Sequence, residues 1–259
     1  FMSISIEQVK ELREQTGVSI MQCKKALEEA GGDFEKALII LKKKSGAAAA
    51  KRAGREAEEG TVVIKTGESE AVICTLHCET DFVAKNEDFK ALAEELAEKA
   101  FTDGIEAMKE NSAEAIAVGV QKVGENIKLG DVTEVTGTVV GSYNHNGKNS
   151  AVVALSGGTP ELAKDIAMQI TALKATYISE DEIPQEDKDK AREHFAEELE
   201  KENKPEDMKA KILDGKLASY FKDQVLLSQS FIKDPSKSIS QLLKEAGDVT
   251  IESYKVQTI

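Results

Sequence analysis

The chain has 259 residues, a formal net charge of −13 at pH 7 and a hydrophobic content of 41%. This length allows one large domain or two to three small ones with a substantial core. No run approaches the roughly 18 apolar residues of a membrane span, and no signal-peptide pattern is present, so we predict no membrane insertion. The negative charge repels phosphate backbones, and direct nucleic-acid binding is not expected. Cys23, Cys74 and Cys78 form no disulfide framework, which favours a reducing compartment. The cytoplasm or an organelle matrix fits, and we predict a cytoplasmic location.

Residues 1–55 are predicted to form a small three-helix head followed by a linker. This segment is basic, with eleven Lys and Arg against seven Asp and Glu, whereas the rest of the chain is acidic. Ser19 and Asp33 are good N-caps for the second and third helices, and the first helix ends at Thr16-Gly17. Apolar residues recur at helical spacing in the second helix: Cys23, Ala26, Leu27 and Ala30. The alanine run at 47–50 indicates a helical or flexible linker.

Two later stretches share one pattern of strands followed by a helix. The Gly-Thr-Val-Val of residues 60–63 recurs at 137–140, and the Ala-Val-Ile of 71–73 recurs as Ala-Val-Val at 151–153. We therefore predict an α+β fold whose core consists of two related subdomains with antiparallel sheets and helices on one face. The first subdomain covers residues 56–136, and the second covers residues 137–180 and 221–234.

The first copy is about seven residues longer than the second between its second strand and its helix. Thr80, Asp81, Phe82 and Val83 lie in this predicted loop. In one interpretation Asp81 or Asn86 caps the following helix and Phe82 folds back onto the body. In the other, an apolar residue on a loop contacts another molecule. The second copy reaches its helix without these residues, which favours a contact with another molecule.

Residues 181–220 are strongly charged and predict a protruding helical hairpin whose turn lies near 203–205. An apolar stripe lies on one face of each predicted helix. It consists of Ala191, Phe195 and Leu199 on the first helix and of Met208, Ile212, Leu213 and Leu217 on the second. The stripes fit either a solvated hairpin arm or a coiled-coil surface that pairs with a second copy or a partner. Residues 235–259 are predicted to form a C-terminal module with a helix and a closing strand.

Cys74, His77 and Cys78 form the one sulfur and imidazole cluster of the sequence, which raises the question of a metal site. Strand alternation places Cys74 and Cys78 on one face and His77 on the other, and no second pair completes four ligands. Two small buried residues on a strand are the simpler interpretation. The sequence also lacks a P-loop, a dinucleotide fingerprint and a nucleophile elbow, and residues 157–160 indicate an ordinary helix start. We predict no catalytic residue, no cofactor and no bound metal.

Several motifs resemble those of the translation elongation factor Ts family, and the resemblance extends over essentially the whole chain. In the head they are Val9-Lys10-Glu11-Leu12-Arg13, Thr16-Gly17-Val18-Ser19 and Cys23-Lys24-Lys25-Ala26-Leu27. Beyond the head they are Thr80-Asp81-Phe82-Val83-Ala84-Lys85, Gly124-Glu125-Asn126-Ile127, Pro235-Ser236-Lys237 and Gln241-Leu242-Leu243-Lys244-Glu245. The resemblance implies a ubiquitin-associated-like three-helix head, a core of two related subdomains, a protruding helical hairpin and a C-terminal module.

The resemblance also implies a guanine-nucleotide exchange factor that binds elongation factor Tu and promotes GDP release during polypeptide elongation. It assigns the displacement of the partner's Mg²⁺ to Thr80, Asp81, Phe82 and Val83. The head and the C-terminal module are then expected to contact the partner's nucleotide-binding domain, and the head residues concerned are Val9, Leu12, Arg13, Thr16 and Gly17. The hairpin is a dimerisation element in some members, so a homodimer is one expectation.

Two other classes of function fit parts of the sequence. A non-catalytic adaptor would use the three-helix head to bind another protein, and that partner would ignore nucleotide. A metal or thiol enzyme built on Cys74 and Cys78 would lose its activity in Cys78→Ser. For an exchange factor, we expect Phe82 to be an apolar wedge and Asp81 to perturb the polar groups around the partner's ion.

Overall fold

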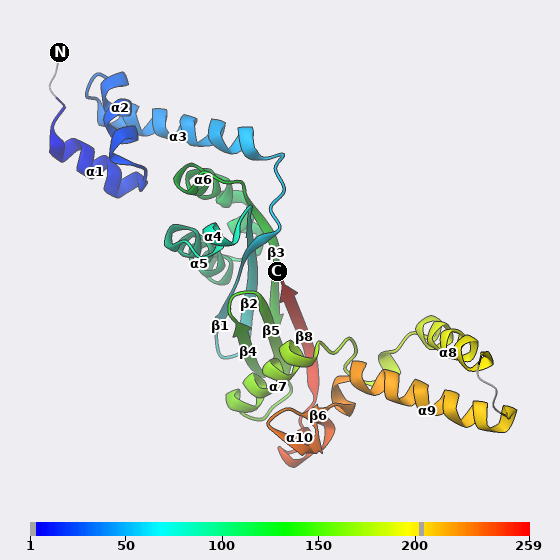
Figure 1. Ribbon diagram of the computed structural model, residues 1–259. Helices are drawn as coiled ribbons and strands as arrows, with labels where there is room; N and C mark the ends of the chain where they lie inside the picture. Colours follow the sequence, from blue (N-terminus) through cyan, green and yellow to red (C-terminus); the bar gives the residue numbers. More distant parts are fainter. Residues whose placement is uncertain (1–3, 202–204) are drawn as a thin grey trace.

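The computed structural model describes residues 4–201 and 205–259, so Asn203 and Lys204 of the predicted hairpin turn lie outside the described residues. Figure 1 shows an elongated molecule, with the head at one end, the two main sheets in the middle and a helical hairpin that projects from the other end. Within the described sheets, neighbouring strands pair in antiparallel fashion. The mixture of helices with antiparallel sheets confirms the predicted α+β class.

The head consists of α1 (Ile6–Thr16), α2 (Ile20–Glu29) and α3 (Phe34–Arg52). The predicted caps are confirmed, because the side chains of Ser19 and Asp33 each accept a hydrogen bond from the backbone three residues on. Gly17 follows α1 with φ of +64°, a left-handed conformation that suits glycine. The apolar faces of the helices bury Leu12, Cys23 and Leu27 completely.

The predicted linker is a continuation of α3, which runs through the alanine run to Arg52. This part of α3 packs along α6 (Ile105–Val123), where Ser45 donates a hydrogen bond to Gln121 and Ala49 packs against the core of the first subdomain. The helical form of the linker is therefore confirmed. One continuous helix joins the head to the body.

The first sheet has the order β1-β2-β3, formed by β1 (Glu59–Thr66), β2 (Glu70–Cys78) and β3 (Ile127–Thr136). Its outer face is covered by α5 (Glu87–Asp103) and α6, and the short helix α4 (Asp81–Ala84) follows β2 (Figure 1). The core beneath these helices contains Leu76, Phe89, Leu96 and Met108, all with at most 1% exposure. Burial of these large apolar side chains stabilises the helices on the sheet.

The second sheet has the order β4-β5-β8, formed by β4 (Val139–His145), β5 (Asn149–Leu155) and β8 (Ile251–Thr258), and α7 (Pro160–Leu173) packs on its outer face. The start of α7 is as predicted, since Thr159 is its N-cap and Pro160 its first residue. The two sheets pack against each other through a shared apolar layer that includes Val62, Ile73, Val140 and Val152. Because β8 pairs with β5, the end of the predicted module 235–259 is part of the second sheet.

The two subdomains share an architecture, but the predicted residue-by-residue alignment between them is wrong. Ala71 and Ile73 face the other sheet, whereas their predicted counterparts Ala151 and Val153 pack beneath α7. Side chains alternate along a strand, so the predicted alignment is shifted by an odd number of residues.

The hairpin arm consists of α8 (Gln185–Glu200) and α9 (Glu206–Gln224), which pack along each other and project from the second subdomain (Figure 1). The predicted stripes are buried only in part, because Ala191 and Leu199 are buried while Met208 remains 49% exposed. Flanking the arm and preceding β8 are η1 (Glu180–Glu182), η2 (Leu226–Ser228), β6 (Ser230–Phe231), β7 (Asp234–Ser238) and α10 (Ile239–Glu245). In the described part of the chain, every helix is too short or too polar to cross a membrane.

Candidate functional site

The junction from β2 to α5 spans residues 79–86, whereas the junction from β5 to α7 spans residues 156–159. The sequence predicts a simple loop at the longer junction. This prediction is wrong, because residues 81–84 form the helical turn α4. Thr80 is the N-cap that stabilises this turn, and its hydroxyl oxygen accepts a hydrogen bond from the backbone N of Val83 at 3.4 Å. We refer to residues 80–83 as the wedge segment.

The wedge segment is packed on one side and exposed on the other. Val83 packs against the core of the first subdomain, and the adjacent Ala84 is buried. Phe82 is 81% exposed, the highest value among the large hydrophobic residues that the structure describes. The interpretation in which Phe82 folds back onto the body is therefore wrong. The turn presents an aromatic ring, with its large apolar contact surface, to the surroundings.

The capping interpretation holds for Asn86 and not for Asp81. The side-chain oxygen of Asn86 accepts hydrogen bonds from the backbone N atoms of Asp88 and Phe89 at 2.9 and 3.4 Å, at the start of α5. Asp81 instead forms an ion pair with Lys85 at 2.7 Å, and this hydrogen bond lowers the pKa of the Asp81 carboxyl group. The carboxylate is thus charged at neutral pH and lies at the surface next to Phe82.

Glu125, between α6 and β3, contacts the start of the wedge segment. Its carboxylate accepts hydrogen bonds from the backbone N atoms of Glu79 and Thr80 at 3.1 and 3.0 Å, and from the Thr80 hydroxyl at 2.7 Å. Glu79 in turn accepts a hydrogen bond from the backbone N of Asn126 at 2.6 Å and forms an ion pair with Arg55 at 3.3 Å. No role for these residues is predicted from the sequence, although Glu125 and Asn126 lie in a motif of the resemblance.

Cys74 and Cys78 are buried in the first core, as predicted, and both are free thiols. Burial raises the pKa of each thiol to about 12, so neither is a nucleophile at neutral pH. The Cys78 thiol donates a hydrogen bond to the carbonyl oxygen of Thr80 at 3.2 Å and thereby supports the wedge segment. Across residues 4–201 and 205–259, no group of three or more His, Cys, Asp or Glu side chains is placed to hold a metal ion.

The head residues of the resemblance fall into two sets. Val9 and Leu12 are 9% and 0% exposed, so they belong to the core of the head and shape its surface from within. Arg13 and Gly17 are exposed, and Thr16 is half-buried with its hydroxyl donating to the carbonyl oxygen of Leu12 at 2.6 Å. The second set lies at the end of α1, where the head faces the body.

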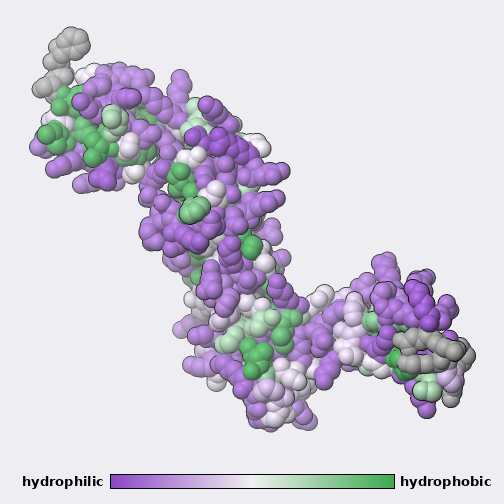
Figure 2. Space-filling view, viewed as in Figure 1, coloured by the Kyte–Doolittle hydropathy of each residue, from purple (hydrophilic) through white to green (hydrophobic). Residues whose placement is uncertain are grey.

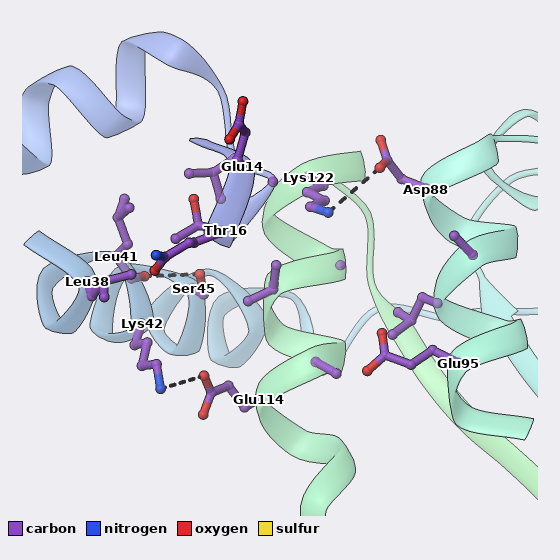
Figure 3. A pocket seen from close by; sticks show the side chains of 18 of the residues that line it. Glu14, Thr16, Leu38, Leu41, Lys42, Ser45, Asp88, Glu95, Glu114 and Lys122 are labelled. Carbon is purple, nitrogen blue, oxygen red and sulfur yellow. Dashed lines mark hydrogen bonds and ion pairs between the residues drawn. The ribbon is translucent and has the colours of Figure 1, made fainter. Parts of the chain in front are cut away.

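A groove of about 720 Å³ separates the end of α1 from α5 and α6 (Figure 3). Ion pairs lie across its edges, with Lys42 of α3 2.8 Å from Glu114 of α6, and Lys122 of α6 3.7 Å from Asp88 of α5. Gly17 lies directly against Lys122, and a side chain at this position would overlap the lysine. Of these contacts, the Lys42–Glu114 ion pair and the approach of Gly17 to Lys122 connect the head to the first subdomain, whereas the Lys122–Asp88 pair lies within that subdomain.

The head also carries exposed apolar residues. Figure 2 shows hydrophobic residues gathered on the surface of the head, and Ile20 and Met21 at the start of α2 are 58% and 65% exposed. Three residues separate them from the end of α1. An apolar surface of this kind is typical of a protein-binding site.

Comparison with known proteins places these features in a family. The family model described as Elongation factor TS matches residues 79–258, a range that includes the wedge segment. The elongation factor Ts of Hahella chejuensis is 40% identical, over 95% of this chain and 88% of that protein. That of Chloroherpeton thalassium is 40% identical over 94% and 92%, and that of Hydrogenovibrio crunogenus is 38% identical over 98% and 90%. The chain therefore belongs to the elongation factor Ts family.

Proposed function

We propose that this chain is a guanine-nucleotide exchange factor that binds GDP-bound elongation factor Tu and promotes GDP release during polypeptide elongation. Membership of the family implies nucleotide exchange on this partner in translation elongation. The observation that carries the proposal is the wedge segment, where the exposed ring of Phe82 sits on a helical turn held by core packing and by Glu125. This activity requires no covalent chemistry of the chain.

Phe82 acts as the apolar wedge. Mg²⁺ requires near-ideal octahedral geometry, so a ring inserted beside its ligands weakens the binding of the ion and of the phosphates that it contacts. Because α4 already holds Phe82 outward, little conformational entropy is lost when the ring enters the partner.

Asp81 acts on the polar groups around the ion. Its carboxylate is ionised, lies next to Phe82 and is paired with Lys85 on the surface. An exposed ion pair of this kind contributes little stability, so the carboxylate can exchange Lys85 for a donor of the partner. Removal of a donor from the nucleotide site favours loss of the ion and of GDP.

The thermodynamic effect is reciprocal. If the factor weakens GDP binding a hundredfold, about 2.7 kcal/mol of coupling free energy, then GDP weakens the binding of the factor by the same amount. Fresh nucleotide then releases the factor, which can act on the next partner molecule.

The head provides a second contact that keeps the wedge segment near its target. In this proposal Arg13, Thr16 and Gly17, together with Ile20 and Met21, form the head surface, and Val9 and Leu12 support it from the core. Docking of the head raises the effective concentration of the wedge segment. We assign a further contact with the nucleotide-binding domain to residues 235–259.

The arm is proposed to pair with a second copy of the chain. Met208 and Tyr220 on α9 are 49% and 45% exposed, which leaves apolar surface for a coiled-coil contact. Sedimentation of the purified chain tests this homodimer, because a monomer at micromolar concentration contradicts it.

Stopped-flow release of fluorescent GDP from purified elongation factor Tu tests the wedge. Phe82→Ala should slow stimulated release far more than it weakens complex formation, whereas Phe82→Leu, which keeps apolar bulk, should retain more activity. Unchanged release in Phe82→Ala contradicts the role of the ring.

A pull-down distinguishes the adaptor alternative, because excess GDP should release the partner of an exchange factor and leave the partner of an adaptor bound.

A further inference from the structure

Glu125 binds the first residues of the wedge segment with both carboxylate oxygens. One oxygen accepts hydrogen bonds from the backbone N atoms of Glu79 and Thr80, and the other accepts the Thr80 hydroxyl. A carboxylate can only accept, and hydrogen bonds to an ionised acceptor are about twice as strong as neutral ones. All three donors belong to the short stretch that precedes α4.

The contact also fixes the direction of the Thr80 hydroxyl group. Since Glu125 accepts its single proton, the hydroxyl oxygen is left with its lone pairs for the backbone N of Val83. The N-cap of α4 therefore depends on Glu125, although the two elements are far apart in the sequence.

The neighbours of Glu125 connect this site to the head helix. The carbonyl oxygen of Gly124 accepts a hydrogen bond from Arg52, the last residue of α3, at 2.9 Å. The side chain of Asn126 donates to the carbonyl oxygen of Arg55 at 2.7 Å. The end of α3, the end of α6 and the wedge segment are thus held in one arrangement.

We propose that Glu125 is a positioning residue for nucleotide exchange, which holds α4 folded and Phe82 in one orientation before the partner binds. The inference rests on the proposed function of the wedge segment. A four-residue helix is too short to be stable alone, so its population depends on its cap and on tertiary contacts. Without Glu125 the backbone donors of Glu79 and Thr80 lose their acceptor, and the turn opens.

An open turn affects rate and binding differently. Phe82 would enter the partner only in the fraction of molecules that have α4 formed, so the rate at saturating factor falls with that fraction. The head would still dock. A positioning role therefore predicts a change in the maximal rate with little change in the concentration of factor that gives half of it.

The test compares Glu125→Ala and Glu125→Gln with the control Glu106→Gln, which removes an exposed carboxylate at the opposite end of α6. GDP release from elongation factor Tu is measured as a function of factor concentration. We expect the maximal rate to fall about tenfold in Glu125→Ala and less in Glu125→Gln, with the half-saturating concentration changed less than about twofold. Glu106→Gln should behave as the unmodified chain.

Two further measurements keep the test decisive. Amide hydrogen exchange in the free chain should be faster at residues 79, 80 and 83 in Glu125→Gln, and unchanged in the control. Combining Thr80→Val with Glu125→Gln should have less than the sum of the two single effects, because both change the hydrogen bond between the Thr80 hydroxyl and Glu125. Unchanged maximal rate and unchanged exchange at these amides overturn the inference, as does a purely additive double variant. If the unmodified chain does not accelerate GDP release, the proposed function fails instead, and the hydrogen exchange still tests the support of α4.

Discussion

The two subdomains differ at the junction between the central strand and the following helix. In the second subdomain, residues 156–159 join β5 to α7, and the cap supplied by Thr159 is sufficient. In the first, residues 79–86 contain an additional helical turn with its own cap and buried contacts, and the carboxylate of Glu125 accepts hydrogen bonds from its first residues. Since the shorter junction supports the same sheet-and-helix arrangement, the architecture does not need the longer one. We propose that the additional turn serves the function instead.

Replacing the longer junction by the shorter one should have the largest effect on nucleotide exchange. Replacing residues 79–86 by the four residues of 156–159 removes the wedge segment and leaves β2 and α5 to be joined as in the second subdomain. We expect stimulated GDP release to fall at least about a hundredfold, because no ring reaches the partner's ion. Rapid release by a folded chimera that still binds the partner contradicts the assignment.

The support beneath the two helices can be compared at their third residues. Phe89 of α5 is fully buried, whereas Leu162 of α7 is only partly buried. Phe89→Ala should lower the free energy of unfolding by about 3–5 kcal/mol, and Leu162→Ala by about 1–2 kcal/mol, since a cavity forms only at the first site. Urea denaturation of both variants measures the difference, and equal losses contradict it.

The helix of the second subdomain lies closer to its sheet. A side chain at Gly141 of β4 would overlap the backbone of Ala163 in α7, so the helix rests directly on the strand. Gly141→Ala should destabilise the protein by about 1–3 kcal/mol through this overlap. Gly157→Ala is the matched control, because a side chain there meets no atom within 4 Å. A loss of stability as large in the control contradicts the close approach.

Alkaline pH should also distinguish the subdomains. Burial raises the pKa of the Cys74 thiol on β2 from 9.0 to about 12, while β5 contains no cysteine. The thiol ionises in the unfolded chain above about pH 9 but stays protonated in the folded chain, so its stabilising contribution is present below pH 9 and is lost toward pH 12. The slope attributable to one such thiol is about 1.4 kcal/mol per pH unit.

Denaturation between pH 8 and pH 11 should therefore show a shallower decline in Cys74→Ala than in the unmodified chain. Hydrogen exchange should also show β2 opening before β5 as the pH rises. Identical pH dependence in the two proteins contradicts the assignment to Cys74.

Features set by neighbouring residues could be predicted from the sequence, and features set by distant contacts could not. The caps Ser19, Asp33 and Thr159 were predictable because each binds a backbone group three residues away. The role of Glu125 was not, because 45 positions separate it from Thr80 and no local pattern links them. Its presence in a motif without an assigned role was the available signal.

The alignment of the two repeats failed for a different reason. The apolar residues of β2 and β5 are buried on both faces of their sheets, so neither strand shows the alternation of polar and apolar residues that fixes a register. The same misalignment made the predicted excess of about seven residues wrong, since the junctions 79–86 and 156–159 differ by four residues. The outward position of Phe82 was nevertheless foreseen, because the first junction is the longer one in either case.

The pairing of β5 with β8 has a consequence for how the chain is made. The first sheet uses strands within residues 59–136, but the second needs residues 251–258, roughly a hundred residues after β5 has left the ribosome. Until then an apolar strand keeps an unpaired edge, which is prone to aggregation. The half that carries the wedge segment can thus fold early in synthesis, while the other half depends on protection until its last strand emerges.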